Sequence, residues 1–271
     1  MLQVQILPVL FLLAMAAGVV LWIVFAAVRA QCTALQAPLY FIGYLYVKLF
    51  WRAELMRPAD WSSGEGAVVV ANHTSSAAPF FVHRACDRVV HWMIAREFVE
   101  HFIWGPMVKI WKVVPANRGG VDTVAMREAI RLTQNGGLVG IFPEGRINMT
   151  EEFMLSFRPG AALIAARADV PIVPIYIQGA PFDRFPHSPF VMPARVKIWV
   201  GTPVRVSDFG DPASAETLKR AMRRVLLQIA DMAGEEVFRP TMAGRNWKPS
   251  REETLRVMEE SYRRRRAAKP G

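Results

Sequence analysis

Hydrophobic and polar positions divide the chain into an apolar N-terminal part and a longer part with mixed patterns. No charged residue occurs from Ile6 to Val28, about 23 positions, and a helix of that length extends roughly 35 Å, enough to span a bilayer. The alternative is a cleaved signal peptide, with Val28 and Ala30 as the small residues before the cut. Because the segment lacks a basic start and is longer than the apolar region of a typical signal, we expect a retained membrane anchor.

A second apolar stretch, Thr33 to Leu55, is interrupted by Pro38. The stretch contains tyrosine and tryptophan, which favour the headgroup level of a bilayer, at Tyr40, Tyr44, Tyr46 and Trp51. An interfacial helix is therefore expected here rather than a second span. Residues 1–57 are predicted to form a helical anchor made of these two segments. The segment Pro58–Glu65, rich in turn formers, begins the second domain, which covers residues 58–271.

From Gly66 onward, short apolar runs alternate with helical patterns, which is typical of an α/β domain with a mostly parallel central sheet flanked by helices. The expected strands are Ala67–Ala71, Val89–Ala95, Leu138–Phe142, Ile172–Ile177 and Val196–Val200. The expected helices are Pro79–Asp87, Gly160–Arg167, Ala215–Ala233 and Arg251–Arg266. A further helix is expected after Gly120, with Val121, Ala125, Ala129 and Leu132 on one face. Pro174 cannot donate a ladder hydrogen bond, so it predicts that its strand lies at a sheet edge or ends there.

Composition adds charge to this picture. The 271 residues are 52% hydrophobic and carry a net charge of +10. The apolar content indicates membrane contact, and the positive charge then favours anionic headgroups or a phosphate-bearing substrate. A nucleic-acid-binding protein would explain the charge but not the apolar content, so no nucleic-acid partner is expected. Arg29, Lys48 and Arg52 follow the first apolar segment, and the positive-inside rule places them on the cytoplasmic side.

The candidate catalytic and binding residues lie in loops that follow strands or precede a helix. His73 follows the first expected strand, and Glu144 and Arg146 follow the third, at strand ends where open α/β sheets bind ligands. Arg118 precedes two glycines and a helix, a setting that suits a phosphate because backbone N–H groups and the helix dipole favour an anion. The ordinary alternatives are an incidental histidine, a surface ion pair and a solvated turn arginine.

Three segments, taken in order, resemble the motifs of a known family. They are Asn72-His73, Phe142-Pro143-Glu144-Gly145-Arg146 and Val170-Pro171-Ile172-Val173-Pro174-Ile175. Together with the segment around Arg118, they are similar to the motifs of the glycerolipid acyltransferase family, which includes the 1-acylglycerol-3-phosphate acyltransferases. Two positions depart from the family pattern. The aspartate of N-H-x-x-x-x-D is replaced by Ala78, and the arginine after the glutamate comes one place early, as Arg146.

The resemblance implies transfer of a fatty acyl group from acyl-CoA or acyl carrier protein, as co-substrate, to a lysophospholipid, without a further cofactor. His73 would be the general base, and the residues expected to bind the acceptor are Asn72, Arg118, Glu144, Gly145 and Arg146. The domain would lie on the cytoplasmic face of an anionic membrane. Ala78 predicts impaired activity, since the acid that orients the imidazole is missing and Asp87 is more simply a cap or surface residue. A lipid-binding protein of the same fold without catalysis is the alternative.

Two further expectations concern the rest of the domain. The aromatic segment Arg96–Trp111 either walls a tunnel for the acyl chain or packs in the core, and both remain open. Three of the histidines outside the motif, His83, His91 and His101, lack the spacing of metal ligands, so no metal site is expected.

Overall fold

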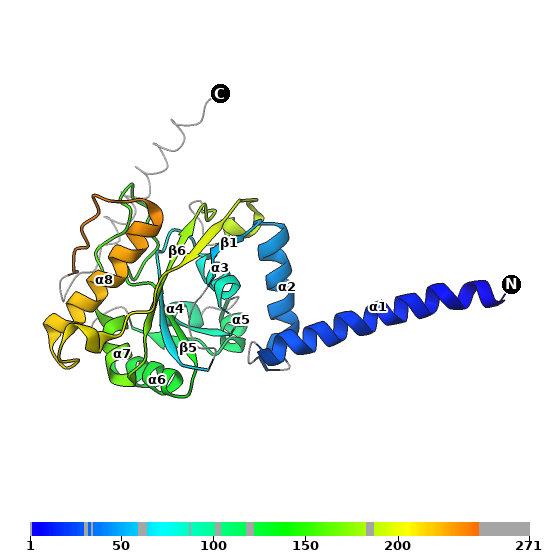
Figure 1. The fold of residues 1–271 in the computed structure, drawn as a ribbon, viewed down its shortest axis with the longest axis horizontal. Coiled ribbons are helices and arrows are strands. Elements are labelled where there is room, and N and C mark those ends of the chain that lie inside the picture. Colours follow the sequence, from blue (N-terminus) through cyan, green and yellow to red (C-terminus); the bar gives the residue numbers. More distant parts are fainter. Residues whose placement is uncertain are drawn as a thin grey trace, which may run out of the picture.

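The computed structural model describes residues 2–29, 32–33, 35–58, 64–86, 88–100, 104–117, 122–182 and 187–243 (Figure 1). Arg118, Asp87 and the expected helix Arg251–Arg266 therefore lie outside the described residues, as does most of the expected linker.

A seven-stranded sheet of order β1-β7-β6-β2-β5-β3-β4 forms the centre of the domain. The strands are β1 Glu54–Arg57, β2 Ala67–Ala71, β3 Val90–Ala95, β4 Val114–Ala116, β5 Leu138–Ile141, β6 Ile172–Gln178 and β7 Lys197–Val200. Every neighbouring pair is parallel except β6 and β7. The predicted α/β class with a mostly parallel sheet is confirmed.

Helices cover both faces of this sheet (Figure 1). They are α1 Leu2–Arg29, α2 Gln36–Leu49, α3 Ala78–Ala85, α4 Arg96–Val99, α5 Trp104–Ile110, α6 Thr123–Gln134, α7 Gly160–Ala168 and α8 Ala215–Ala233, with the short 3-10 helices η1 Ser188–Val191 and η2 Val206–Phe209. Along β2, Val68 and Val70 face the core beneath α6, α7 and α8. Val69 faces the core shared with α2 and α3. Burial on both faces explains why β2 is apolar at every position rather than at alternate ones.

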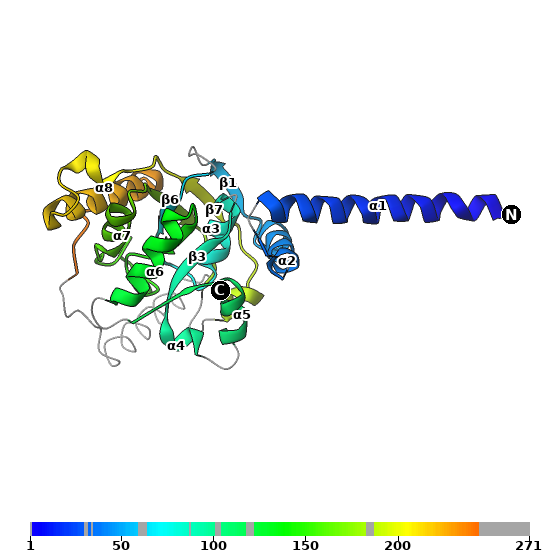
Figure 2. The ribbon, with the colours of Figure 1, turned by 90° about the horizontal axis from the view of Figure 1, so that it is seen from below.

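α1 projects away from the domain in both ribbon views (Figures 1 and 2). Its segment Pro8–Phe25 has a mean hydropathy of 2.6, and none of that segment is buried. The helix is long and apolar enough to cross a membrane, although a signal sequence near the N-terminus would meet the same criterion. Trp22 of α1 contacts Phe41 of α2 edge to face, with ring centroids 5.1 Å apart. Of the two predicted anchoring helices, only α1 is supported as a membrane anchor among the described residues.

The second apolar stretch differs from its prediction. Its helix, α2, ends at Leu49, and Trp51 is fully buried, with Nε1 donating hydrogen bonds to the carbonyls of Pro189 and Met192 at 3.1 Å each. The Tyr46 hydroxyl likewise donates to the Phe190 carbonyl. Trp51 therefore packs in the domain interior, and the headgroup placement expected for it is wrong, whereas Tyr46 is only half-buried.

The sheet also begins earlier than the sequence suggested. β1 pairs in parallel with β7, with Glu54 opposite Lys197, so the first strand precedes the expected domain start at residue 58. The edge position expected from Pro174 is wrong, because β6 lies between β2 and β7 in the interior of the sheet. Pro174 is the register partner of Val70 in β2, and its carbonyl accepts from the Gly201 N–H at 2.8 Å. The ladder between β6 and β7 begins one residue later, at Ile175.

Candidate functional site

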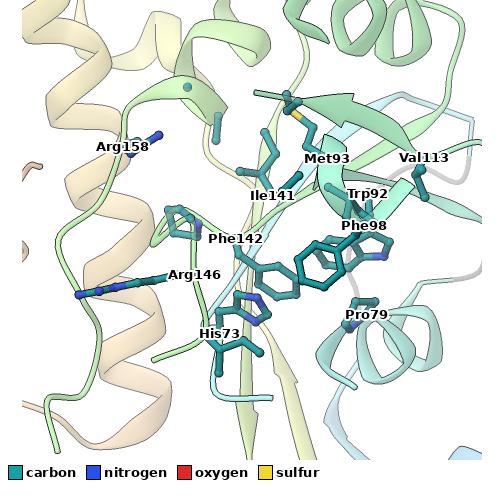
Figure 3. A pocket seen from close by; sticks show the side chains of 18 of the residues that line it. His73, Pro79, Trp92, Met93, Phe98, Val113, Ile141, Phe142, Arg146 and Arg158 are labelled. Atoms are coloured by element: carbon teal, nitrogen blue, oxygen red, sulfur yellow. The ribbon is translucent and has the colours of Figure 1, made fainter. Parts of the chain in front are cut away.

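The loops that follow β2 and β5 lie next to each other at the carboxyl ends of these strands. β2 and β5 are parallel neighbours with Val70 opposite Ile141, so the residues after each strand emerge side by side. The His73 ring stacks on the Phe142 ring, with centroids 3.9 Å apart and planes 9° from parallel (Figure 3). Phe142 in turn stacks on Trp92 at 4.4 Å. The sequence placed His73 at a strand end, and the structure adds the aromatic stack that supports its ring.

Trp92 reaches this stack because β5 has a glycine opposite it. Gly140 is the register partner of Trp92, and a Cβ at Gly140 would lie 2.7 Å from the Trp92 indole. No larger residue fits there without moving the indole. Gly140 therefore supports the position of His73 indirectly, through Trp92 and Phe142.

Glu144 holds the main chain of His73. Its Oε1 accepts from the His73 N–H at 2.8 Å, and its Oε2 accepts from the Leu155 N–H at 2.9 Å. The Asn148 N–H donates to the His73 carbonyl at 2.6 Å, so both backbone groups of His73 are bonded to the β5 loop. Only 1% of Glu144 is exposed, and this burial raises the pKa of its carboxyl to about 7, against the opposing effects of the two N–H donors and of Arg146.

Asn72 is the second anchor of this loop. Its side-chain amide donates to the Ile177 carbonyl at 2.9 Å and accepts from the Ile177 N–H at 2.8 Å, and the residue is buried. Both ends of the amide are thus bonded to β6. We call Asn72, Glu144 and Asn148 together the backbone clamp of His73. Asn72 and Glu144 were expected to bind the acceptor. In the structure their side chains bind protein backbone, and acceptor binding by them stays a prediction.

Position 78 lies at the start of the helix that follows His73. Ala78 is the first residue of α3, is 1% exposed, and donates its N–H to the Ser75 carbonyl at 3.1 Å. Its methyl group belongs to the apolar core on the α2 side of the sheet. The clamp of His73 is complete, whereas the position expected to orient its imidazole carries no carboxylate.

A cavity of about 1020 Å³ opens beside His73. Much of its wall is apolar and aromatic, including Trp92, Met93, Phe98 and Trp111. The segment from Arg96 onward therefore lines a cavity at Phe98, Val108 and Trp111, which favours the tunnel interpretation over simple core packing at these positions. Phe102 lies outside the described residues.

Three arginines of the described part of the chain line the same cavity: Arg84, Arg146 and Arg158. Among its described lining residues the one carboxylate is that of Asp122, which caps α6 by accepting from the N–H groups of Val124 and Ala125 and also accepts from that of Asn117. In Figure 3 the Arg146 guanidinium extends away from the stacked His73 and Phe142 rings. The cavity therefore combines an apolar wall with an excess of positive charge, which suits an anionic amphiphile.

Residues 52–178 match a family model described as Acyltransferase. The 1-acyl-sn-glycerol-3-phosphate acyltransferase of Bacillus subtilis (strain 168) is 28% identical over 139 residues, which make up 51% of this chain and 66% of the relative's length, just under two thirds. Residues 52–178 of this chain are therefore similar to the acyltransferase domain. A crystal structure of the 1-acyl-sn-glycerophosphate (LPA) acyltransferase PlsC from Thermotoga maritima is 20% identical, with a TM-score of 0.49 over 77% of this chain and 87% of that one.

The acyltransferase motif residues thus divide into two groups. His73, Gly145 and Arg146 line the cavity, and Gly145 adopts a φ of +68° that strains any residue with a Cβ. Asn72 and Glu144 lie behind them in the clamp. Arg118 cannot be placed, although its neighbour Asn117 lines the cavity. In the part of the chain that the structure describes, no three His, Cys, Asp or Glu residues are grouped to hold a metal ion.

Arg158 and Asn148 were missed by sequence reasoning. Arg158 is joined to the motif loop by its N–H, which donates to the Pro143 carbonyl at 3.0 Å. The signal that could have found it is its position just before Pro159-Gly160, which opens α7. Asn148 offered no comparable signal, because its contribution to the clamp is a backbone N–H.

Proposed function

We propose that this protein transfers a fatty acyl group from an acyl thioester to the free hydroxyl of a lysophospholipid, with 1-acylglycerol-3-phosphate as the acceptor and with activity impaired by Ala78. The observation that carries the proposal is the clamped His73 beside a large apolar cavity that is rich in arginine. The name of the Bacillus relative supports the same reaction class.

The reaction assigns one chemical role to His73. The acceptor hydroxyl oxygen attacks the thioester carbonyl carbon while the imidazole takes the hydroxyl proton. The tetrahedral intermediate then breaks its C–S bond, and the leaving thiolate takes the proton from the imidazolium. The products are the diacyl lipid and the free thiol of coenzyme A or acyl carrier protein. The apolar wall suits the acyl chain, and Arg146 and Arg118 suit the acceptor phosphate.

A second candidate is a membrane-anchored protein that binds lipid without transferring acyl groups, and Ala78 is the observation that favours it. A thioester-release assay separates the two candidates. The protein in membranes would be supplied with acyl-CoA or acyl-loaded carrier protein and with lysophosphatidate. Thiol release that depends on the acceptor and is lost in His73→Ala supports transfer. Saturable lipid binding without acceptor-dependent release, even at high protein concentration, supports the alternative.

Membrane attachment is part of the proposal, with the domain on the cytoplasmic face. α1 carries an uncharged segment long enough to span a bilayer, so the protein should stay in the membrane pellet after washing with high salt or alkaline carbonate. A variant that lacks residues 2–29 is the matched comparison and should be extracted more readily. Release of the full chain by salt alone would contradict the anchor and leave only electrostatic attachment.

A further inference from the structure

The last turn of α3 brings two polar side chains to the part of the cavity wall that α2 forms. His83 and Arg84 both line the cavity there, together with Tyr40 and Tyr44 of α2. The Arg84 guanidinium carbon lies over the Tyr44 ring, 5.6 Å from its centroid. The His83 ring contacts the rings of Tyr40 and Trp111, with centroid distances of 6.2 Å and 5.5 Å. Aromatic rings thus fix the directions of both side chains.

These polar groups lack the partners that such groups normally have. His83 Nδ1 and Arg84 Nε are shielded from solvent and make no hydrogen bond in the structure. Among the described residues no carboxylate forms an ion pair with Arg84. Buried side-chain donors are almost always hydrogen-bonded, and exceptions call for a functional explanation. A guanidinium held on a ring without a counter-charge is a site prepared for an anion.

Neither group is used by the proposed acyl transfer, which relies on His73 and on the arginines of the motif loops. Burial and the neighbouring His91 lower the pKa of His83 to about 4, so its imidazole is neutral at physiological pH and keeps one N–H to donate. Arg84 supplies the charge and His83 supplies an uncharged donor. Asp122, the described carboxylate of the cavity wall, is engaged with backbone N–H groups.

We propose that Arg84 and His83 form a second anion subsite that receives the phosphate of a lipid headgroup at the α2 side of the cavity. Its ligand is a phosphate on an apolar chain, because the surrounding wall is aromatic and α2 connects directly to the apolar helix α1. Two sources share this chemistry, a lysophospholipid acceptor and a phospholipid of the bilayer. Binding at this subsite requires no acyl transfer, so it can be tested independently of the proposed function.

The test is equilibrium binding to the full chain in a neutral detergent, without an acyl donor. The probes are lysophosphatidate, phosphatidylglycerol and a monoacylglycerol with the same acyl chain but no phosphate. Arg84→Gln should weaken binding of at least one phosphate-bearing lipid by about tenfold or more, the range expected when a charged hydrogen bond is lost. Arg84→Lys should retain most of the affinity. Arg223→Gln, which removes an exposed arginine from α8, should change nothing.

The three probes identify the source of the phosphate. A loss confined to lysophosphatidate assigns the subsite to the acceptor, and a loss confined to phosphatidylglycerol assigns it to a bilayer lipid. The proposal is overturned if Arg84→Gln binds both lipids as Arg223→Gln does. It is also overturned if monoacylglycerol binding falls equally, because Arg84 would then only support the cavity wall. Should Arg84→Gln fail to fold, His83→Phe keeps the ring packing and removes both nitrogens. That variant must lose part of the selectivity for phosphate over monoacylglycerol, and unchanged selectivity would overturn the proposal.

Discussion

The main chain of His73 and the ring of His73 are supported very differently. The main chain is bonded at both its N–H and its carbonyl, by Glu144 and Asn148, and the adjacent Asn72 is bonded twice to β6. The ring stacks on Phe142, but at position 78, where the family places an acid, the chain has a buried methyl group. Hydrogen bonds thus fix the main chain of His73, while position 78 carries a methyl group where the resemblance predicts a carboxylate.

This contrast bears on how the site works. Placement of His73 depends on buried hydrogen bonds that also stabilise the fold, so their loss would be costly whether or not the protein catalyses a reaction. The acid at position 78 would act mainly on proton transfer, and its absence leaves the fold intact. A lone alanine in a complete clamp thus separates the structural and the chemical parts of one motif.

The largest expected effect comes from supplying the missing group. Ala78→Asp should raise kcat by about three to four orders of magnitude, by analogy with the loss of the acid in the serine-protease triad. The new carboxylate would hold one tautomer of His73 and stabilise its imidazolium, and the start of α3 is electrostatically favourable for it. The measurement is acceptor-dependent thiol release by the purified protein in neutral detergent or in membranes.

Two variants control this experiment. Adding His73→Ala to Ala78→Asp should abolish the gain. Ala77→Asp places the same charge one residue earlier, at a position that is also fully buried, and should produce none. Rapid turnover by the unaltered chain, or no turnover after Ala78→Asp, would show that a histidine–acid pair does not describe this site.

An intermediate effect is expected at Arg146, two residues after the clamp residue Glu144. Arg146 lines the cavity and Glu144 does not, so Arg146→Ala should weaken lysophosphatidate binding about ten- to a hundredfold while leaving the free energy of unfolding nearly unchanged. Arg118→Ala is expected to do the same if both arginines hold one phosphate. Arg127→Ala, on the exposed side of α6, is the matched control for loss of charge. Parental binding by both the Arg118 and the Arg146 variants would remove the phosphate assignment.

The sequence predicted most of this fold because its strands are short, apolar and bounded by turn residues. The five expected strands all occur within a residue or two of their predicted bounds, as do α3, α7 and α8, and α6 occurs where a helix was expected after Gly120. The sequence did not predict β1 and β4 because they are short edge strands, and residues at an edge need not be apolar on both faces. Pro174 led to a wrong prediction because its missing N–H argues against an interior position, whereas β6 lies between β2 and β7.

The motif order predicted which residues gather at the site, but their roles stay predictions. Motif order placed His73, Gly145 and Arg146 together, but it gave Asn72 and Glu144 to the substrate. Whether a polar side chain faces a ligand or the backbone depends on burial and on partners more than 70 residues away in sequence, which no local pattern encodes. Trp51 was misjudged for the same reason, since its partners belong to the distant segment around η1.

The smallest expected effect is a pH dependence of stability that arises in the clamp. Burial raises the pKa of Glu144 to about 7, well above its ordinary value of 4.5. The folded protein therefore binds this proton more tightly than the unfolded chain does. The resulting stabilisation is fully present below pH 4.5 and is lost as the pH rises through about 7, so the free energy of unfolding should fall across that window. Denaturant unfolding in neutral detergent at several pH values measures the slope.

Glu144→Gln tests whether this slope belongs to the clamp. Glutamine does not titrate, so the fall between pH 4.5 and 7 should become shallower. Its amide can accept from only one of the His73 and Leu155 N–H groups, so the variant should also lose about 1–3 kcal/mol of stability by leaving the other donor unpaired. Glu151→Gln removes an exposed carboxylate from the same loop and should leave the slope as it is. An unchanged slope in Glu144→Gln would mean that the pH dependence arises elsewhere, and that the clamp keeps its charge throughout this range.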